Sequence, residues 1–198
     1  MQLLLVRHAL PLRSEAGQGS DPHLSADGVE QAKRLPDALA RFPISRLLSS
    51  PQRRAVQTGQ PVSDALGLPI DIDERIAEYD YELSHYTPIE EASEEDIKRL
   101  MSGELPGDVD AAAFQARVRA GIDDVVAAAE HDATVAVFTH GGVINSLVHQ
   151  IMKTESLLCV QVDYTGVTRL LSHRDGRLSV ASINGTEHVW DLLPRNQR

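Results

Sequence analysis

The stretch LLLVRHALP (residues 3–11) begins with four apolar residues and then places Arg7 next to His8. A continuous apolar run predicts a strand that is buried on both faces, as the strands of parallel sheets are. Two ionisable side chains at the end of such a strand cost free energy when they leave water, unless a partner or a ligand compensates them. The stretch therefore predicts a buried strand of an α/β domain and marks the carboxyl end of that strand as a candidate functional site.

Apolar runs alternate with helical patterns along the 198 residues. Helical periodicity follows Ser25, a suitable cap, and is expected to kink or split at Pro36. Ser50 and Pro51 predict the start of a second helix, with serine at the N-cap, and Pro61 predicts a kink within it. Further elements are expected as strands at residues 44–48, 70–72 and 134–138, a helix at 143–152, and two or three antiparallel strands between 157 and 183. This order predicts one α/β domain spanning residues 1–198.

The negative charge of the chain is concentrated in one internal segment. The chain carries 29 acidic and 19 basic residues, a net charge of −10, and residues 79–132 alone hold 14 acidic and 4 basic residues. Helical patterns at residues 89–101 and 111–129 lie within this segment. We therefore expect an inserted acidic helical segment, or lid, at residues 79–132 of the same domain.

The composition limits the class of protein. No basic patch of the size that nucleic-acid binding requires is visible, and no run approaches the ~20 apolar residues of a membrane span. The one cysteine, Cys159, excludes an internal disulfide and a cysteine-built metal site, and it lies in the strand-like run LLCVQV, where a buried apolar role is expected. We expect a soluble, cytoplasmic protein that binds neither nucleic acid nor a membrane; the sequence does not indicate its oligomeric state.

Side chains capable of chemistry follow four of the predicted strands. In chain order they are Arg7-His8, SSPQRR (residues 49–54), Glu78 with Asp80 nearby, and THGG (residues 139–142). The carboxyl ends of parallel strands meet at one edge of a sheet, where ligands bind. Taken singly, each has a structural explanation, such as a solvated helix face for Arg54 or turn geometry for the two glycines. Their common placement favours a site of arginines, two histidines and a carboxylate, a set suited to phosphate.

These motifs resemble the histidine phosphatase superfamily, which includes the cofactor-dependent phosphoglycerate mutases. The matching stretches are LVRHA (5–9), DPHLSADGVEQA (21–32), SSPQRRAVQT (49–58), the glutamate of IAEYD (76–80) and THGG (139–142). The ordered set, which covers residues 3–145, carries the resemblance. It implies a three-layer sandwich with a mostly parallel central sheet flanked by helices, and it places the acidic segment over the entrance of the active site.

The resemblance also implies phosphoryl transfer through a phosphohistidine on His8. Carried over position by position, Arg7, Arg54 and His140 bind the phosphoryl group and Glu78 is the acid–base residue. Imidazole attacks phosphorus only when it is neutral, and the two neighbouring arginines disfavour a further positive charge on His8.

The chain departs from the family pattern around these residues. Ala9 stands where the family usually has glycine, and Pro11 and Ser14 stand where a Thr or Ser and an Asn commonly contact phosphate. Ser14 can still donate a hydrogen bond to the substrate, whereas Pro11 cannot. Glu82 replaces a glycine four residues beyond the acid, and Asp80 remains a rival for the role of the acid, since spacing does not separate the two carboxylates.

A phosphatase that hydrolyses a small phosphomonoester is the function that the motifs favour. This chemistry requires neither a metal nor a cofactor, and the other histidines show no HxxxH spacing. The alternatives are a cofactor-dependent phosphoglycerate-type mutase, a non-catalytic phosphate-binding module and a metal-dependent hydrolase. The intact phosphate-binding set speaks against the module, and the histidine spacing speaks against the metal enzyme.

Overall fold

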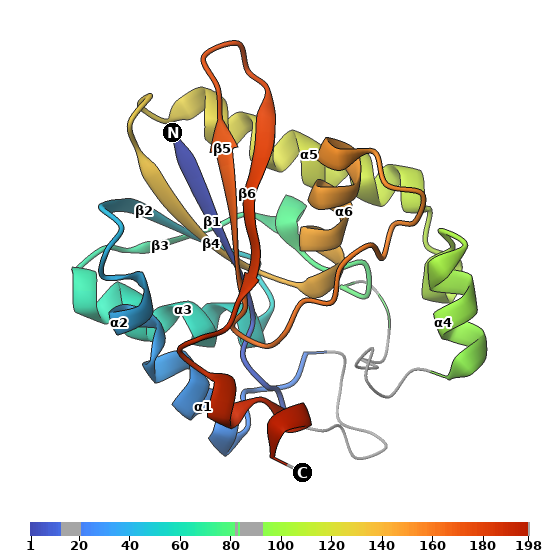
Figure 1. Ribbon diagram of the computed structural model, residues 1–198, viewed down its shortest axis with the longest axis horizontal. Coiled ribbons are helices and arrows are strands. Elements are labelled where there is room, and N and C mark those ends of the chain that lie inside the picture. The colour runs from blue at the N-terminus through green and yellow to red at the C-terminus, as the bar shows by residue number, and fades with distance from the viewer. Residues whose placement is uncertain (13–20, 82, 84–92, 198) are drawn as a thin grey trace.

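A six-stranded sheet with the order β3-β2-β4-β1-β5-β6 runs through the molecule (Figure 1). The computed structural model describes residues 1–12, 21–81, 83 and 93–197. The strands are β1 (Gln2–Arg7), β2 (Ile44–Ser49), β3 (Ile70–Ile72), β4 (Thr134–Thr139), β5 (Val167–Ser172) and β6 (Leu178–Gly185). The α-helices are α1 (Ala26–Lys33), α2 (Leu35–Leu39), α3 (Arg53–Leu66), α4 (Glu94–Met101), α5 (Ala111–Ala128) and α6 (Gly141–Met152). Short 3-10 helices are η1 (Glu74–Ile76), η3 (Pro106–Asp108), η4 (Trp190–Leu192) and η5 (Pro194–Asn196).

The first four strands pair in parallel and the last two are antiparallel. β4 lies between β1 and β2, and β3 pairs with β2, all in the same direction. β5 runs antiparallel to β1, and β6 antiparallel to β5. The predicted mostly parallel sheet is confirmed. In the register of β1 and β4, Arg7 faces Thr139, so the residues that follow the two strands leave the sheet at the same point.

Side chains of β1 alternate between two cores, one on each face of the sheet. Leu3 and Leu5 join the core beneath α5 and α6, whereas Leu4 and Val6 join the core beneath α2 and α3. Figure 1 shows these two groups of helices on opposite sides of the sheet. Strands buried on both faces explain the continuous apolar run at the start of the chain. The predicted three-layer α/β sandwich is confirmed.

The first helical region is divided as its proline suggested. Ser25 caps α1, since its side chain accepts a hydrogen bond from the backbone N–H of Gly28. Arg34 separates α1 from α2, and Pro36 lies in the first turn of α2, where a missing N–H costs no helical hydrogen bond. The predicted split is confirmed.

The predicted start of the second long helix at Ser50 and Pro51 is wrong. α3 begins at Arg53 with Gln52 at its N-cap. The Ser50 hydroxyl instead lies 2.7 Å from Nε2 of His140, and it accepts the backbone N–H of Gln52. The helix then runs past Pro61 as one element, so the kink expected there does not interrupt it.

The predicted strand through Cys159 is also wrong. The tail forms the two antiparallel strands β5 and β6, and the described residues 157–163 belong to no strand. The backbone N–H groups of Cys159 and Val160 donate to the side-chain carbonyl of Asn145 on α6, at 3.0 and 2.9 Å. These donors are therefore not available to a neighbouring strand. The Cys159 side chain is half-buried against the core beneath α5 and α6, in keeping with an apolar role.

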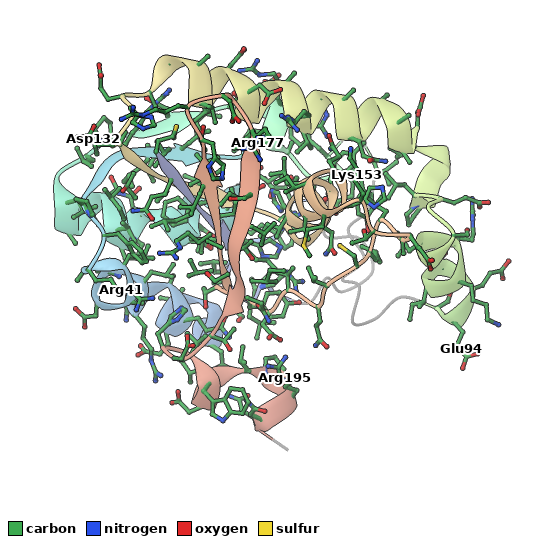
Figure 2. The ribbon with its side chains drawn as sticks, turned by 45° about the horizontal axis from the view of Figure 1, so that its top comes forward. Arg41, Glu94, Asp132, Lys153, Arg177 and Arg195 are labelled. Atoms are coloured by element: carbon green, nitrogen blue, oxygen red, sulfur yellow. The ribbon has the colours of Figure 1, made fainter. Side chains whose placement is uncertain are left out.

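The acidic segment contributes α4 and α5, close to the predicted helical ranges. Residues 82 and 84–92 lie outside the described residues. Figure 2 shows Glu94, at the start of α4, at the opposite edge of the molecule from Arg41. The expected place of this segment over the active-site entrance stays a prediction. None of the helices in the described parts of the chain is long and apolar enough to cross a membrane.

Candidate active site

The residues that follow β1 and β4 lie next to each other. The backbone N–H of His8, after β1, donates to the carbonyl of Thr139 at 2.8 Å. His140, after β4, is the N-cap residue of α6. The two histidine rings are 5.2 Å apart between centroids, and both are buried. The parallel register of the two strands thus brings the histidines of two separate motifs together.

A backbone carbonyl sets the orientation and tautomer of the His8 ring. Nδ1 of His8 lies 2.8 Å from the carbonyl oxygen of Ala9. Because a carbonyl only accepts hydrogen bonds, Nδ1 carries the proton and the lone pair of the neutral ring is on Nε2. Burial, and then the charges of Arg54 and Arg7, lower the pKa of His8 well below its ordinary value of 6.5. The ring is therefore neutral at physiological pH and has a nucleophilic Nε2.

Arg7 is fixed by the segment that leads into β5. Its Nη1 donates to the carbonyl of Val162 at 2.6 Å, and its guanidinium carbon lies 4.1 Å from the centroid of the Tyr164 ring. The same ring lies 5.8 Å from the His8 ring, between centroids. A cation over an aromatic face is held by the quadrupole of the ring, so Tyr164 orients Arg7 beside the nucleophile.

Arg54 is buried between two carboxylates. Its Nη2 lies 3.2 Å from Oδ1 of Asp80, and its Nη1 lies 3.8 Å from Oδ1 of Asp21. Asp80 also accepts a hydrogen bond from Nε2 of Gln52 at 3.0 Å. Burial raises the pKa of Asp80, while its contacts with Arg54 and Gln52 oppose this rise. Asp80 thus serves as the counter-ion of Arg54, which makes it the weaker candidate for the acid.

Glu78 is buried at the amino end of α6. One carboxylate oxygen accepts the backbone N–H of Gly142 at 2.8 Å, and the other accepts the N–H of Tyr79 at 3.1 Å. A Cβ atom at Gly142 would lie 2.3 Å from Oε1 of Glu78, so the close approach of this carboxylate requires glycine. Burial, and then the charge of Asp80, raise the pKa of Glu78 to about 7. A carboxyl group with this pKa can both donate and accept a proton at neutral pH.

His140 is held by a serine that the sequence assigned to a helix cap. Its Nε2 lies 2.7 Å from the Ser50 hydroxyl, whereas its buried Nδ1 has no hydrogen-bond partner among the described residues. Burial, and then the charges of Arg54, His8 and Arg7, lower the pKa of His140 well below 6.5. A buried nitrogen of this kind is suited to an anionic ligand, because a negative charge would raise the pKa again.

The five predicted residues of the catalytic set lie at the same edge of the sheet. They are Arg7, His8, Arg54, Glu78 and His140. Ser14, the remaining predicted substrate contact, lies outside the described residues. Sequence reasoning missed the roles of Ser50, Gln52 and Tyr164. Of the three, only Tyr164 has a local signal, since the glycine that follows Tyr164-Thr165 indicates a turn. Among the described residues, no group of three or more His, Cys, Asp or Glu side chains is placed to hold a metal ion.

Residues 3–186 match the family model described as "Histidine phosphatase superfamily (branch 1)". The chain belongs to this superfamily. A relative from Hydrogenobacter thermophilus, provisionally named phosphoserine phosphatase 2, is 31% identical over 190 residues, which cover 90% of this chain and 92% of the relative. Phosphoserine phosphatase 1 of the same organism is 32% identical over 135 residues, 63% of this chain and 64% of the relative. The expectation of a phosphatase from this superfamily is confirmed.

Solved structures share the fold over nearly the whole chain. The phosphoserine phosphatase of Entamoeba histolytica, in complex with 3-phosphoglyceric acid, has a TM-score of 0.75 and 21% identity, and covers 95% of this chain and 98% of its own. A mycobacterial glucosyl-3-phosphoglycerate phosphatase has a TM-score of 0.76 and 22% identity, with 93% and 99% covered. At this level of identity, the likeness shows the fold alone.

Proposed function

We propose that the chain hydrolyses a small phosphomonoester and that Nε2 of His8 is the transient acceptor of the phosphoryl group. The observation that carries this proposal is the hydrogen bond from Nδ1 of His8 to the Ala9 carbonyl, 2.8 Å long. It holds the ring in the tautomer whose Nε2 is a nucleophile, and the low pKa of the buried ring keeps that lone pair available.

Positive groups surround the position that the phosphoryl group would take. Arg7 and Arg54 stabilise the charge on the transferring oxygens, where most of the catalysis of phosphoryl transfer arises. His140 binds a phosphate oxygen through Nδ1, and it takes up a proton when the dianion arrives because the added negative charge raises its pKa. The arginines and His140 thus act on the transferring group, while His8 attacks it.

Glu78 moves the protons in both half-reactions. In the first, the Nε2 lone pair forms the N–P bond, the P–O bond to the alcohol breaks, and the leaving oxygen takes the proton of the Glu78 carboxyl. In the second, the Glu78 carboxylate takes a proton from water as the water oxygen attacks phosphorus, and the N–P bond breaks to return the lone pair to His8. A pKa of about 7 supports both roles at neutral pH.

The charges around Arg54 support a singly phosphorylated substrate. Asp80 and Asp21 already compensate this guanidinium from two sides, at 3.2 and 3.8 Å. A second phosphate on the substrate would find little uncompensated positive charge there, and a lid formed by the acidic residues 79–132 would repel it further. A phosphoglycerate-type mutase needs a bisphosphorylated compound to prime its histidine, so these charges favour hydrolysis. Relatives named as phosphoserine phosphatases support a small phosphorylated metabolite as substrate.

Rapid-quench trapping tests this proposal. The wild-type protein is mixed with a phosphate-labelled aryl phosphomonoester in excess chelator, and an acid-labile, base-stable protein adduct is expected within one turnover. His8→Ala should form no adduct, whereas His173→Ala, on the exposed β5–β6 turn, should behave as wild type. An adduct in His8→Ala, or full turnover by it, would show that the nucleophile is another residue.

The cellular location of the protein is a separate proposal. The cytoplasmic location expected from the sequence stays a prediction, which fractionation of cells that express the protein would test.

A further inference from the structure

A single guanidinium contacts four carbonyls of the loop that carries the acid. Arg117 lies on α5, within the acidic segment, and is partly buried. Its Nη1 donates to the carbonyls of Glu74 and Arg75, both at 2.9 Å. Its Nη2 donates to the carbonyl of Ala77 at 3.0 Å and reaches that of Glu78 at 3.5 Å.

The remaining carbonyl of this loop, that of Ile76, accepts a hydrogen bond from a side chain of β4. The Thr139 hydroxyl, at the end of β4, donates to the carbonyl of Ile76 at 2.9 Å. Every carbonyl from residue 74 to residue 78 therefore receives a side-chain hydrogen bond, and Arg117 supplies all but one of these bonds. The carbonyls of Glu74 and Glu78 also accept backbone N–H groups, from Ala77 and Tyr81, and the side-chain bonds add to these. A planar guanidinium presents its donors in a fixed fork, which suits it to several carbonyls at once.

We propose that Arg117 is a positioning residue for the general acid: it holds the 74–78 loop so that the Glu78 carboxyl lies against the amino end of α6. The inference rests on the proposed role of Glu78. The tolerance at that place is small, because the carboxylate binds the N–H of Gly142 at 2.8 Å in space that only glycine leaves open. A displacement of about 1 Å in a catalytic group can cost on the order of 100-fold in rate.

A purely structural role for Arg117 and a role in positioning the acid predict different losses of rate across substrates. If the residue merely anchors α5, its removal should lower the rate for every substrate by the same factor. If it positions the acid, the loss should depend on the leaving group, because an activated aryl phosphate needs no proton from Glu78 and an alkyl phosphate does. The dependence on the leaving group therefore separates positioning from general stabilisation.

The test compares kcat/KM for an alkyl and an activated aryl phosphomonoester. The variants are Glu78→Gln, Arg117→Ala, Arg117→Lys and the double variant Glu78→Gln/Arg117→Ala. Arg117→Lys retains the charge and loses the fork, and it serves as the second probe if Arg117→Ala folds poorly. Arg119→Ala is the matched control, since this arginine lies on the same helix, is about one third exposed and pairs with Asp123.

We expect Glu78→Gln to lower kcat/KM about 10²–10⁴-fold for the alkyl ester and little for the aryl ester. Arg117→Ala should lower kcat/KM roughly 10–100-fold for the alkyl ester alone. Arg117→Lys should likewise lower kcat/KM for the alkyl ester and not for the aryl ester. In the Glu78→Gln background, Arg117→Ala should add no further loss selective for the alkyl ester. Arg119→Ala should match wild type.

Three results would overturn one or both proposals, and they distinguish the positioning role of Arg117 from the acid role of Glu78. Equal losses on both esters in the Arg117 variants, or a selective loss that persists in the Glu78→Gln background, would sink the positioning role while the role of Glu78 stands. A Glu78→Gln variant without leaving-group dependence would refute the acid itself, and the positioning role with it.

Discussion

Replacing Glu78 by glutamine should remove a loss of folding stability that the wild-type protein undergoes as the pH rises. The folded protein retains the Glu78 proton up to a pKa of about 7, whereas the unfolded chain loses it at the ordinary value of 4.5. Folding therefore becomes less favourable as the pH rises through this window, and the loss is complete above pH 7. A separation of about 2.5 in pKa corresponds to about 3 kcal/mol, or roughly 6–12 °C in Tm for a chain of this length. Glutamine has the shape of the carboxyl and no charge to bury, but its NH2 group would face one of the two backbone N–H groups that Glu78 accepts, a cost that does not depend on pH.

Urea unfolding of wild type and Glu78→Gln at pH 5 and pH 8 measures this effect. Between pH 5 and pH 8, the stability difference between the two proteins should shift by roughly 2–3 kcal/mol in favour of the variant. Glu74→Gln, an exposed glutamate at the start of the same loop, provides the control and should show no such dependence on pH. A stability difference that does not change with pH, or one that moves against the variant as the pH rises, would refute the argument that burial of this carboxyl raises its pKa.

Three further outcomes follow from the charges and close contacts of the site. Asp80→Asn removes a negative charge that is, second to burial, the main reason for the raised pKa of Glu78. The limb of the pH profile of kcat/KM that is assigned to Glu78 should therefore move to lower pH, and a shift to higher pH would contradict this. Gly142→Ala places a Cβ atom 2.3 Å from Glu78 and should lower alkyl phosphomonoester turnover about 100-fold, whereas Gly141→Ala, with 3.6 Å to its nearest neighbour, should lose much less. The preference for a neutral-tailed monoester over bisphosphoglycerate should narrow as salt screens the acidic residues, and a ratio indifferent to salt would argue against repulsion.

The parts of the site that follow buried strands could be predicted from the sequence. The apolar runs before Arg7-His8 and before THGG (residues 139–142) are short and continuous, which indicates strands buried on both faces, and parallel pairing brings their ends together without further information. Glu78 is indicated by the motif that surrounds it, because the strand that precedes it, β3, is only three residues long and gives a weak pattern. These predictions depend on local pattern and on the geometry common to parallel sheets.

The parts that were missed or wrong depend on contacts between distant residues. Ser50 is of a residue type that often caps helices, but its hydroxyl forms a hydrogen bond with His140, ninety residues away in the chain. Arg117 on its helix resembles a solvated arginine, and nothing near it in the sequence indicates the loop carbonyls that it binds. The run around Cys159 has the apolar character of a strand, and the amide side chain of Asn145 takes its backbone donors instead. In each case a tertiary partner competed successfully with the local preference.

The pairing of β1 with β4 also has a consequence for how the chain reaches this structure. Gln2 lies opposite Thr134, so β1 leaves the ribosome well before β4 and must wait for a partner more than 130 residues behind it. At roughly 5–20 residues per second, that delay lasts about 7–26 s. During this time the stretch LLLV (residues 3–6) lacks both strands that flank it in the sheet, β4 and β5, although all four side chains end fully buried. Such an exposed apolar segment is a candidate for chaperone binding, and enzymatic activity after refolding should return only once β1 and β4 have paired, because His8 and His140 meet when these two strands do.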